Sequence, residues 1–140
     1  MSERWVIDAS VGLAWVHPAQ ATEESDGLLR QLKQGVTLVV PGLWFQETAN
    51  ALLVLERRKK LKADERHEAL VTLRALNTKP DFEGTYLAFG KVSELAELHG
   101  LSIYDATYLE LALREQAPLG TKDAPLQKAA KNSGVPLLLK

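Results

Sequence analysis

Cysteine is absent from this chain of 140 residues, and Trp, Tyr and Phe occur only three times each. The lack of cysteine excludes a disulfide framework, a thiolate metal site and a cysteine nucleophile. No apolar run approaches the roughly 20 residues that a bilayer-spanning helix needs. The first residues, with Glu3 and Arg4 leading straight into an apolar run, lack the pattern of a signal peptide. We therefore expect a cytoplasmic protein without membrane association.

The composition is that of an ordinary globular chain. Hydrophobic residues make up 46% and charged residues 25%, and a chain of this length usually forms one domain, so we expect a single domain over residues 1–140. The net charge is −1 with a pI near 6.3. This balance gives no general support for binding a nucleic acid, so a polyanionic partner would have to be held by local basic patches or by a bound cation.

Predicted strands alternate with predicted helices along the chain. The predicted strands are Arg4 to Ile7, Thr37 to Val40, Pro118 to Gly120 and Val135 to Leu139, with a turn or weak edge strand at Asn77 to Asp81. The predicted helices are Ser10 to Val16, Thr22 to Gln34, Leu43 to Lys60, Ala63 to Leu76, Gly84 to His99, Ser102 or Ile103 to Glu115, and Ala124 to Lys131. This alternation predicts an α/β fold with a short, mainly parallel central sheet flanked by helices on both faces.

Four acidic residues stand where an apolar run meets a helix start or the first turns of a helix. Asp8 follows a predicted strand, Glu47 lies just inside the helix after the second strand, Asp105 follows the strand-like run Leu101 to Tyr104, and Asp123 follows Pro118 to Thr121. Taken singly, each acid is better explained as a helix cap, a turn residue or a partner of the helix dipole. Together they predict one crevice, because all the carboxyl ends of parallel strands share an edge. Clustered carboxylates favour a hard divalent cation such as Mg²⁺ or Mn²⁺.

These residues, in this order, resemble the motifs of PIN-domain nucleases, and most closely those of VapC-type toxins. The resemblance covers nearly the whole chain. It is carried by Val6-Ile7-Asp8-Ala9-Ser10, by Pro41 through Glu47 to Asn50-Ala51-Leu52, by Leu101 through Asp105 to Ala112, and by Leu119-Gly120-Thr121-Lys122-Asp123 with the segment that follows. One departure is Gly120, which stands where the family commonly has a small apolar residue.

The resemblance implies a single PIN-like nuclease domain in which Asp8, Glu47, Asp105 and Asp123 hold Mg²⁺ or Mn²⁺. It implies Ser10, Asn50 and Thr121 as supporting polar residues. The implied activity is that of an endoribonuclease toxin that hydrolyses RNA phosphodiester bonds with metal-activated water. The implied partners are an RNA substrate, a VapB-type antitoxin and a second copy of the chain.

Basic residues near this predicted site are candidate phosphate contacts. Arg57 and Arg58 open the densest basic run, although a favourable charge at the C-terminus of a helix and a solvated face explain them somewhat better than phosphate contact. Lys122 lies between two predicted site residues. The three histidines have no spacing typical of a metal site, and we assign them no catalytic role.

Other functions fit the sequence less well. A signalling receiver domain also has an acidic magnesium pocket, but it needs paired acids after the first strand, where this chain has only Asp8. A nucleotide-binding Rossmann enzyme is disfavoured because neither G-x-G-x-x-G nor G-x-x-x-x-G-K-[ST] occurs. The main alternative is a catalytically silent PIN-like module that binds RNA or protein.

Overall fold

Four short parallel strands form the central sheet of this computed structural model, which describes residues 3–140. They are β1 (Arg4–Ile7), β2 (Thr37–Pro41), β3 (Thr78–Asp81) and β4 (Leu119–Gly120), in the spatial order β3-β2-β1-β4. Each neighbouring pair is parallel. The carboxyl ends of all four strands therefore lie along one edge of the sheet, as predicted.

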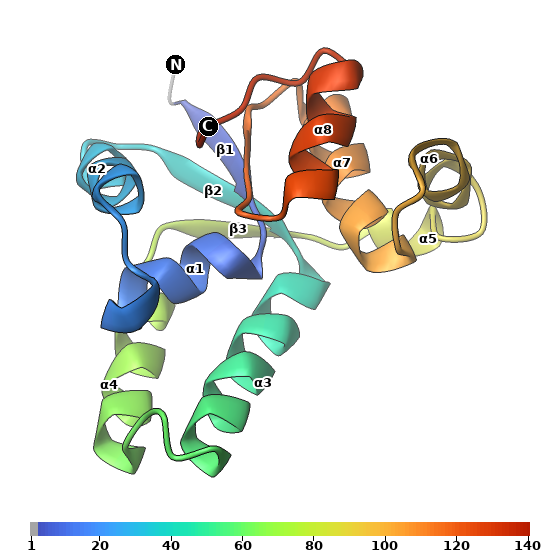
Figure 1. Cartoon of the computed structure of the whole chain (residues 1–140). Coiled ribbons are helices and arrows are strands. Elements are labelled where there is room, and N and C mark those ends of the chain that lie inside the picture. The colour runs from blue at the N-terminus through green and yellow to red at the C-terminus, as the bar shows by residue number, and fades with distance from the viewer. Residues whose placement is uncertain (1–2) are drawn as a thin grey trace.

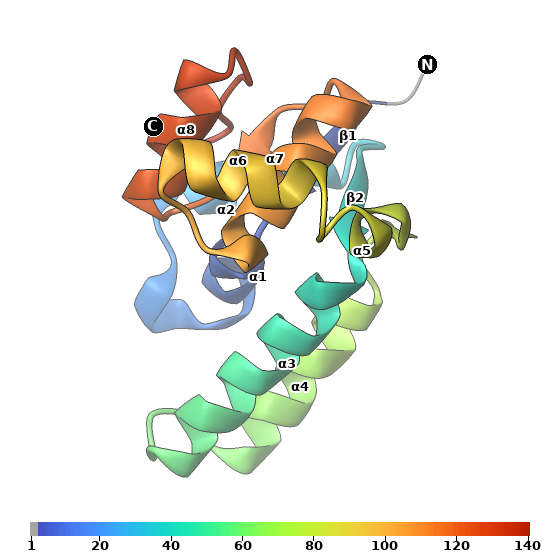
Figure 2. The ribbon, with the colours of Figure 1, turned by 90° about the vertical axis from the view of Figure 1, so that its right-hand side faces the viewer.

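Helices cover both faces of the sheet, which confirms the predicted α/β layering (Figure 1). On one side lie α1 (Ala9–Val16), α3 (Gly42–Arg57) and α4 (Ala63–Arg74), and on the other lie α7 (Ile103–Glu115) and α8 (Ala124–Asn132). The remaining helices are η1 (Pro18–Gln20), α2 (Glu23–Leu32), α5 (Glu83–Tyr86) and α6 (Lys91–His99). Figure 2 shows α3 and α4 side by side, extending away from the rest of the molecule. No helix within residues 3–140 is long and apolar enough to cross a membrane.

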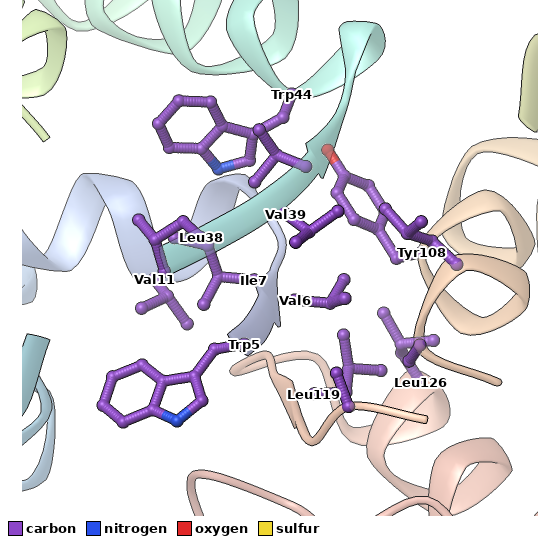
Figure 3. Close-up of a cluster of buried hydrophobic side chains, with 14 of the residues drawn as sticks. Trp5, Val6, Ile7, Val11, Leu38, Val39, Trp44, Tyr108, Leu119 and Leu126 are labelled. Atoms are coloured by element: carbon purple, nitrogen blue, oxygen red, sulfur yellow. The ribbon is translucent and has the colours of Figure 1, made fainter. Parts of the chain in front are cut away.

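The core forms where the strands meet these helices (Figure 3). Val6, Ile7, Leu38 and Leu119 on the strands are fully buried. Alternate side chains of a strand point to opposite faces, so strands buried on both faces need near-continuous apolar sequence, which β1 and β2 have. Trp44 of α3 joins this core, and its indole N–H donates to the backbone oxygen of Asp8 at 3.2 Å. The first turn of α3 is thereby held against the end of β1.

Hydroxyl side chains cap the starts of two helices. The Thr22 hydroxyl accepts a hydrogen bond from the Ser25 amide at 3.1 Å at the start of α2. At the start of α7, the Ser102 hydroxyl accepts one from the Asp105 amide at 3.0 Å. Such side chains satisfy backbone N–H groups that have no partner within the helix.

Three sequence-based predictions of secondary structure are wrong. Leu101 to Tyr104 is not strand-like, because the Ser102 cap starts α7 at Ile103 and places Asp105 in the first helical turn. The helix predicted for Gly84 to His99 is split into α5 and α6, since Gly90 adopts a non-helical backbone with φ −126° and ψ −108°.

The C-terminal segment also differs from its prediction. The strand predicted for Val135 to Leu139 is reduced to a single bridge, in which Leu137 pairs with Leu119. Leu119 donates to the carbonyl of Pro136 at 2.9 Å and accepts from the Leu138 amide at 3.0 Å. Pro136 has no N–H with which to continue a ladder, and β4 is only two residues long, so pairing stops there.

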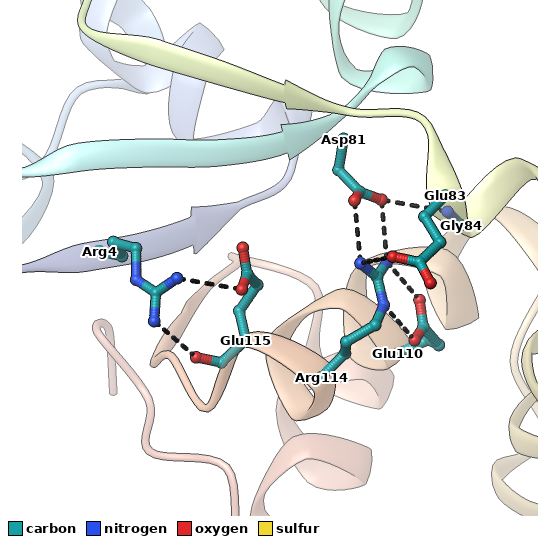
Figure 4. A network of polar contacts seen from close by, with 7 residues as sticks. All are labelled: Arg4, Asp81, Glu83, Gly84, Glu110, Arg114 and Glu115. Carbon is teal, nitrogen blue, oxygen red and sulfur yellow. Dashed lines mark hydrogen bonds and ion pairs between the residues drawn. The ribbon is translucent and has the colours of Figure 1, made fainter.

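A partly buried ion-pair network fixes α7 to the edge of the sheet (Figure 4). Arg114 of α7 donates to both carboxylate oxygens of Asp81, at 2.9 and 2.8 Å, and to both of Glu110, at 2.9 and 3.0 Å. A weaker contact of 3.2 Å reaches the exposed Glu83. Hydrogen bonding to Arg114 lowers the pKa of Asp81. The bidentate contact with Asp81 joins α7 to the end of β3, while the contact with Glu110, within α7, holds the guanidinium in place.

Candidate active site

Asp8 stands directly after β1, and its carboxylate is held by two hydroxyl groups. The Ser10 amide and hydroxyl both donate to Oδ1, at 3.0 and 2.5 Å, and the Thr121 hydroxyl donates to Oδ2 at 2.5 Å. The side chain is 7% exposed. Burial raises the pKa of Asp8, and the hydrogen bonds from Ser10 and Thr121 act against that shift by favouring the charged form. Asp8 is also the N-cap of α1, so its role as a helix cap and its place among the clustered acids are compatible.

The loop after β4 meets Asp8 through the same two hydroxyls. The Thr121 hydroxyl accepts from the Asp123 amide at 3.0 Å, and the Ser10 hydroxyl accepts from the Lys122 amide at 2.9 Å. Each hydroxyl gives its single proton to Asp8 and takes a proton from the loop backbone. Asp123 in turn caps α8, since its Oδ2 accepts from the Leu126 amide at 3.0 Å. Ser10 and Thr121 therefore join the end of β1 to the loop that follows β4.

Glu47 reaches the same region from α3, one turn beyond Trp44. Its Oε1 accepts a hydrogen bond from the Tyr108 hydroxyl at 2.5 Å. Burial raises the pKa of Glu47, the Tyr108 hydrogen bond lowers it, and the charges of Asp105 and Asp8 raise it further. The negative charges of Asp105 and Asp8 therefore both act on Glu47.

Asp105 completes the cluster from the first turn of α7. Burial raises its pKa, and the negative charge of Asp123 raises it further. Asp8 and Asp105 thus act on Glu47, and Asp123 acts on Asp105. The fold therefore brings the four predicted acids into one region, although the first and the last are 115 positions apart in the sequence.

The donor chemistry of this cluster fits a hard divalent cation. All four side chains offer carboxylate oxygens, and none of them forms a salt bridge with a basic residue within residues 3–140. Negative charges that lie near one another are stabilised by a cation placed among them. Within the same residues, no group of three or more Asp, Glu, His or Cys side chains is already gathered closely enough to hold an ion. Asp105 is only partly buried, so its side chain has room to turn toward the other acids.

The outer predicted residues occupy different places. Asn50 lies on the exposed surface of α3, one turn beyond Glu47. Arg57 and Arg58 lie at the far end of α3, about 15 Å along the helix from Glu47 at 1.5 Å per residue. Lys122 is exposed, and its Nζ donates to the backbone oxygen of Gln20 at 2.6 Å. None of these positions excludes contact with a long polyanion, but Arg57 and Arg58 are remote from the acids.

Two contributors to the site were missed by the sequence analysis. Tyr108 was read only as part of a helix motif, yet it bonds directly to Glu47. Its position three residues after Asp105, on the same face of α7, was the available signal. Gln127, whose amide donates to the backbone oxygen of Thr121 at 2.8 Å, gave no signal in the sequence.

A family model described as the PIN domain matches residues 5–132. The chain therefore belongs to the PIN-domain family, and the resemblance inferred from its motifs is confirmed. It is 34% identical over 122 residues to VapC ribonuclease Mb0985 of Mycobacterium bovis, covering 86% of this chain and 87% of that protein. Ribonuclease VapC9 of Mycobacterium tuberculosis matches with the same identity and coverage.

Solved structures support the fold at lower identity. PAE2754 from Pyrobaculum aerophilum superposes with a TM-score of 0.68 and 22% identity, covering 98% of this chain and 84% of that one. VapBC2 from Rickettsia felis, solved bound to a DNA fragment from its promoter, gives a TM-score of 0.66 at 14% identity, with 96% of each chain covered. These likenesses concern the fold alone.

Proposed function

We propose that this protein is a Mg²⁺- or Mn²⁺-dependent endoribonuclease, the toxin component of a toxin–antitoxin pair. The proposal is carried by the acids Asp8, Glu47, Asp105 and Asp123, which lie near the carboxyl edge of the sheet and have no salt-bridge partner among residues 3–140. The names of the relatives, VapC ribonucleases that match along 86% of this chain, supply the substrate class.

Each group of residues has a defined task in this proposal. A bound divalent ion lowers the pKa of its water and offsets charge on the phosphate during hydrolysis. Asp8, Glu47, Asp105 and Asp123 hold the ion. Ser10 and Thr121 keep the Asp8 carboxylate charged and oriented, because both donate hydrogen bonds to it. Lys122, at the rim, is available to contact an RNA phosphate if its bond to Gln20 opens.

The proposal extends to partners. A toxin of this class is held inactive by an antitoxin protein, and the solved structures include a VapBC complex and FitAcB from Neisseria gonorrhoeae, with a TM-score of 0.64. We propose a VapB-type antitoxin partner, action on RNA in the cytoplasm, and a homodimer. Exposed aromatic residues suit such contacts, because aromatic side chains are enriched at interfaces. They are Phe82, Tyr86, Phe89 and Tyr104.

The test is cleavage of a mixed cellular RNA pool by protein freed of any co-purifying partner. Mn²⁺ or Mg²⁺ would be supplied, with EDTA and Asp8→Asn as inactive controls, and the ends would be mapped by sequencing. Asp26→Asn is the matched control, since it makes the same change at an exposed acid on α2. Discrete cuts that carry 5′-phosphates, present with Asp26→Asn and lost with EDTA and Asp8→Asn, are the expected result.

The alternative function is a catalytically silent module that binds RNA or protein. It is favoured by the absence, within residues 3–140, of three ligand-type side chains already gathered around one point. One outcome of the cleavage test separates the two functions. Protein that binds Mn²⁺ and RNA but leaves every RNA in the pool intact would support the silent module and overturn the nuclease.

A further inference from the structure

A buried hydrogen bond joins Tyr108 to Glu47, one of the four clustered acids. The Tyr108 side chain is 1% exposed, and its hydroxyl lies 2.5 Å from Oε1 of Glu47 on another helix. A buried hydroxyl needs a partner, and this one has a carboxylate 61 positions away along the chain. In Figure 3 the hydroxyl of Tyr108 points out of the apolar cluster, toward the end of β2 and the start of α3.

The ring of Tyr108 is held rigidly, and Glu47 is not. A buried tyrosine has only two side-chain torsions, both fixed by packing, so its hydroxyl is a fixed point in the core. Glu47 is only partly buried and has three torsions, so without a bond it would sample several rotamers. The Tyr108 hydroxyl binds Oε1 only, and Oε2 forms no hydrogen bond with any described residue. One oxygen is therefore anchored and the other is left for a ligand.

Tyr108 also links two of the acid-bearing helices. Asp105 lies three residues before it on α7, so both side chains lie on the same side of that helix. The bond to Glu47 joins this side of α7 to α3. We propose that Tyr108 is a positioning residue, which holds Oε2 of Glu47 toward the other carboxylates so that a divalent cation can bind among them. This inference rests on the proposed function, because it assumes that the acid cluster is a metal site.

The test measures metal binding directly and needs no RNA. Mn²⁺ binding to purified wild-type protein and to Tyr108→Phe would be followed by calorimetry and by the electron paramagnetic resonance signal of free Mn²⁺. Tyr108→Phe keeps the ring in the core and removes only the hydroxyl. We expect about a tenfold loss of Mn²⁺ affinity, the range typical when a partner of a ligating side chain is removed. Tyr104→Phe makes the same change one turn earlier on α7, at an exposed ring, and we expect unchanged affinity.

A double-mutant cycle separates positioning from general structural damage. Glu47→Ala removes the group through which Tyr108 is proposed to act. If the inference holds, adding Tyr108→Phe to Glu47→Ala lowers Mn²⁺ affinity no further, and the two effects are strongly non-additive. If Tyr108 merely supports the core, its loss should weaken binding equally in both backgrounds, and that result would overturn the inference.

The remaining outcomes are also decisive. Wild-type affinity in Tyr108→Phe overturns the positioning role and leaves the metal site in place. Absence of Mn²⁺ binding in the wild-type protein itself overturns both this inference and the proposed function. Circular dichroism of each variant accompanies the binding measurement, and an unfolded Tyr108→Phe would be replaced by Tyr108→Met, which fills the core without a hydroxyl.

Discussion

The hydroxyl of Thr121 donates a 2.5 Å hydrogen bond to Oδ2 of Asp8, across 113 positions of sequence. The two residues follow neighbouring parallel strands, since Ile7 of β1 pairs with Gly120 of β4. The bond therefore ties the ends of these strands together at the edge where the acids gather. It also makes Thr121, which is 1% exposed, part of the site although it carries no charge.

Thr121→Val should weaken the site without removing an acid. Valine has nearly the same shape, so the main loss is the hydrogen bond that favours charged Asp8, and we expect the pKa of Asp8 to rise further. Because Asp8 and the Asp123 amide both lose a partner, stability should fall by roughly 1–2 kcal/mol. Titration by ¹³C NMR and urea unfolding would measure these effects. Thr72→Val, at an exposed position on α4, is the matched control, and equal losses in both variants would contradict the prediction.

Asp105→Asn should stabilise the metal-free protein at neutral pH. The pKa of Asp105 is raised in the folded state, so the folded form binds a proton more tightly than the unfolded form, and stability falls as pH rises from about 3.8 through the raised value. Asparagine removes this penalty. We expect a gain of roughly 0.5–1 kcal/mol at pH 7, as for partly exposed charges, and a smaller gain near pH 4.

Thermal unfolding in EDTA at several pH values would measure this gain. Asp26→Asn on α2 provides the comparison, since that acid is exposed and lies in a different helix. A gain for Asp105→Asn that is the same at pH 4 and pH 7 would show that charge repulsion is not its source. Saturating Mn²⁺ should reverse the order, because the wild-type protein gains binding energy that the variant lacks.

Arg114→Met should be the most destabilising of these changes. It leaves Glu110, which is 4% exposed, and Asp81 without their cationic partner, and removing one member of a buried pair costs about 3 kcal/mol or more. Glu83→Gln removes only a contact whose acid is 66% exposed, and it should change stability by less than about 0.5 kcal/mol. Urea unfolding at pH 7 tests both. Because the pKa of Asp81 is lowered, its part of this stabilisation is lost as pH falls below 3.8 through the lowered value, and the gap between wild type and Arg114→Met should narrow there.

Arg57→Ser combined with Arg58→Ser tests the basic run as a phosphate contact. If both residues contact single-stranded RNA, the slope of log affinity against log salt should fall by about 1.4, since each contact contributes about 0.7. Binding would be measured in an Asp8→Asn background, which prevents cleavage. Arg30→Ser combined with Lys33→Ser, at the C-terminal end of α2, is the matched pair. Unchanged affinity and slope for the α3 pair would assign Arg57 and Arg58 to the solvated end of the helix.

Each of the four acids could be proposed from the sequence because each one follows a local signal. Asp8 and Asp123 cap helices, and capping residues at the ends of parallel strands converge without any knowledge of side-chain packing. Tyr108 could not be assigned in the same way. Its partner lies on another helix, and only the packing of α7 against the sheet determines which residue its hydroxyl meets.

The errors in secondary structure have a similar origin. The break between α5 and α6 depends on one glycine conformation, at Gly90, which apolar periodicity does not reveal. The C-terminal apolar segment has the composition of a strand, but a strand also needs a neighbour of matching length. β4 offers two residues, so only Leu137 pairs. Local sequence preference therefore determines which segments are extended, and the length of the neighbouring strand determines how many of their residues join the sheet.

Both edges of the sheet are protected against pairing with another strand. On one side β3 carries exposed Lys79 and Pro80, a charge and a residue without an N–H, and on the other the tail beyond α8 already occupies Leu119. Natural proteins use these devices against strand-by-strand aggregation. These features favour recruitment of partner proteins through helices and loops over the addition of a strand to the sheet. Replacing both protective residues of β3, as in Lys79→Val with Pro80→Val, would instead expose a strand edge on which further copies of the chain could pair into fibrils.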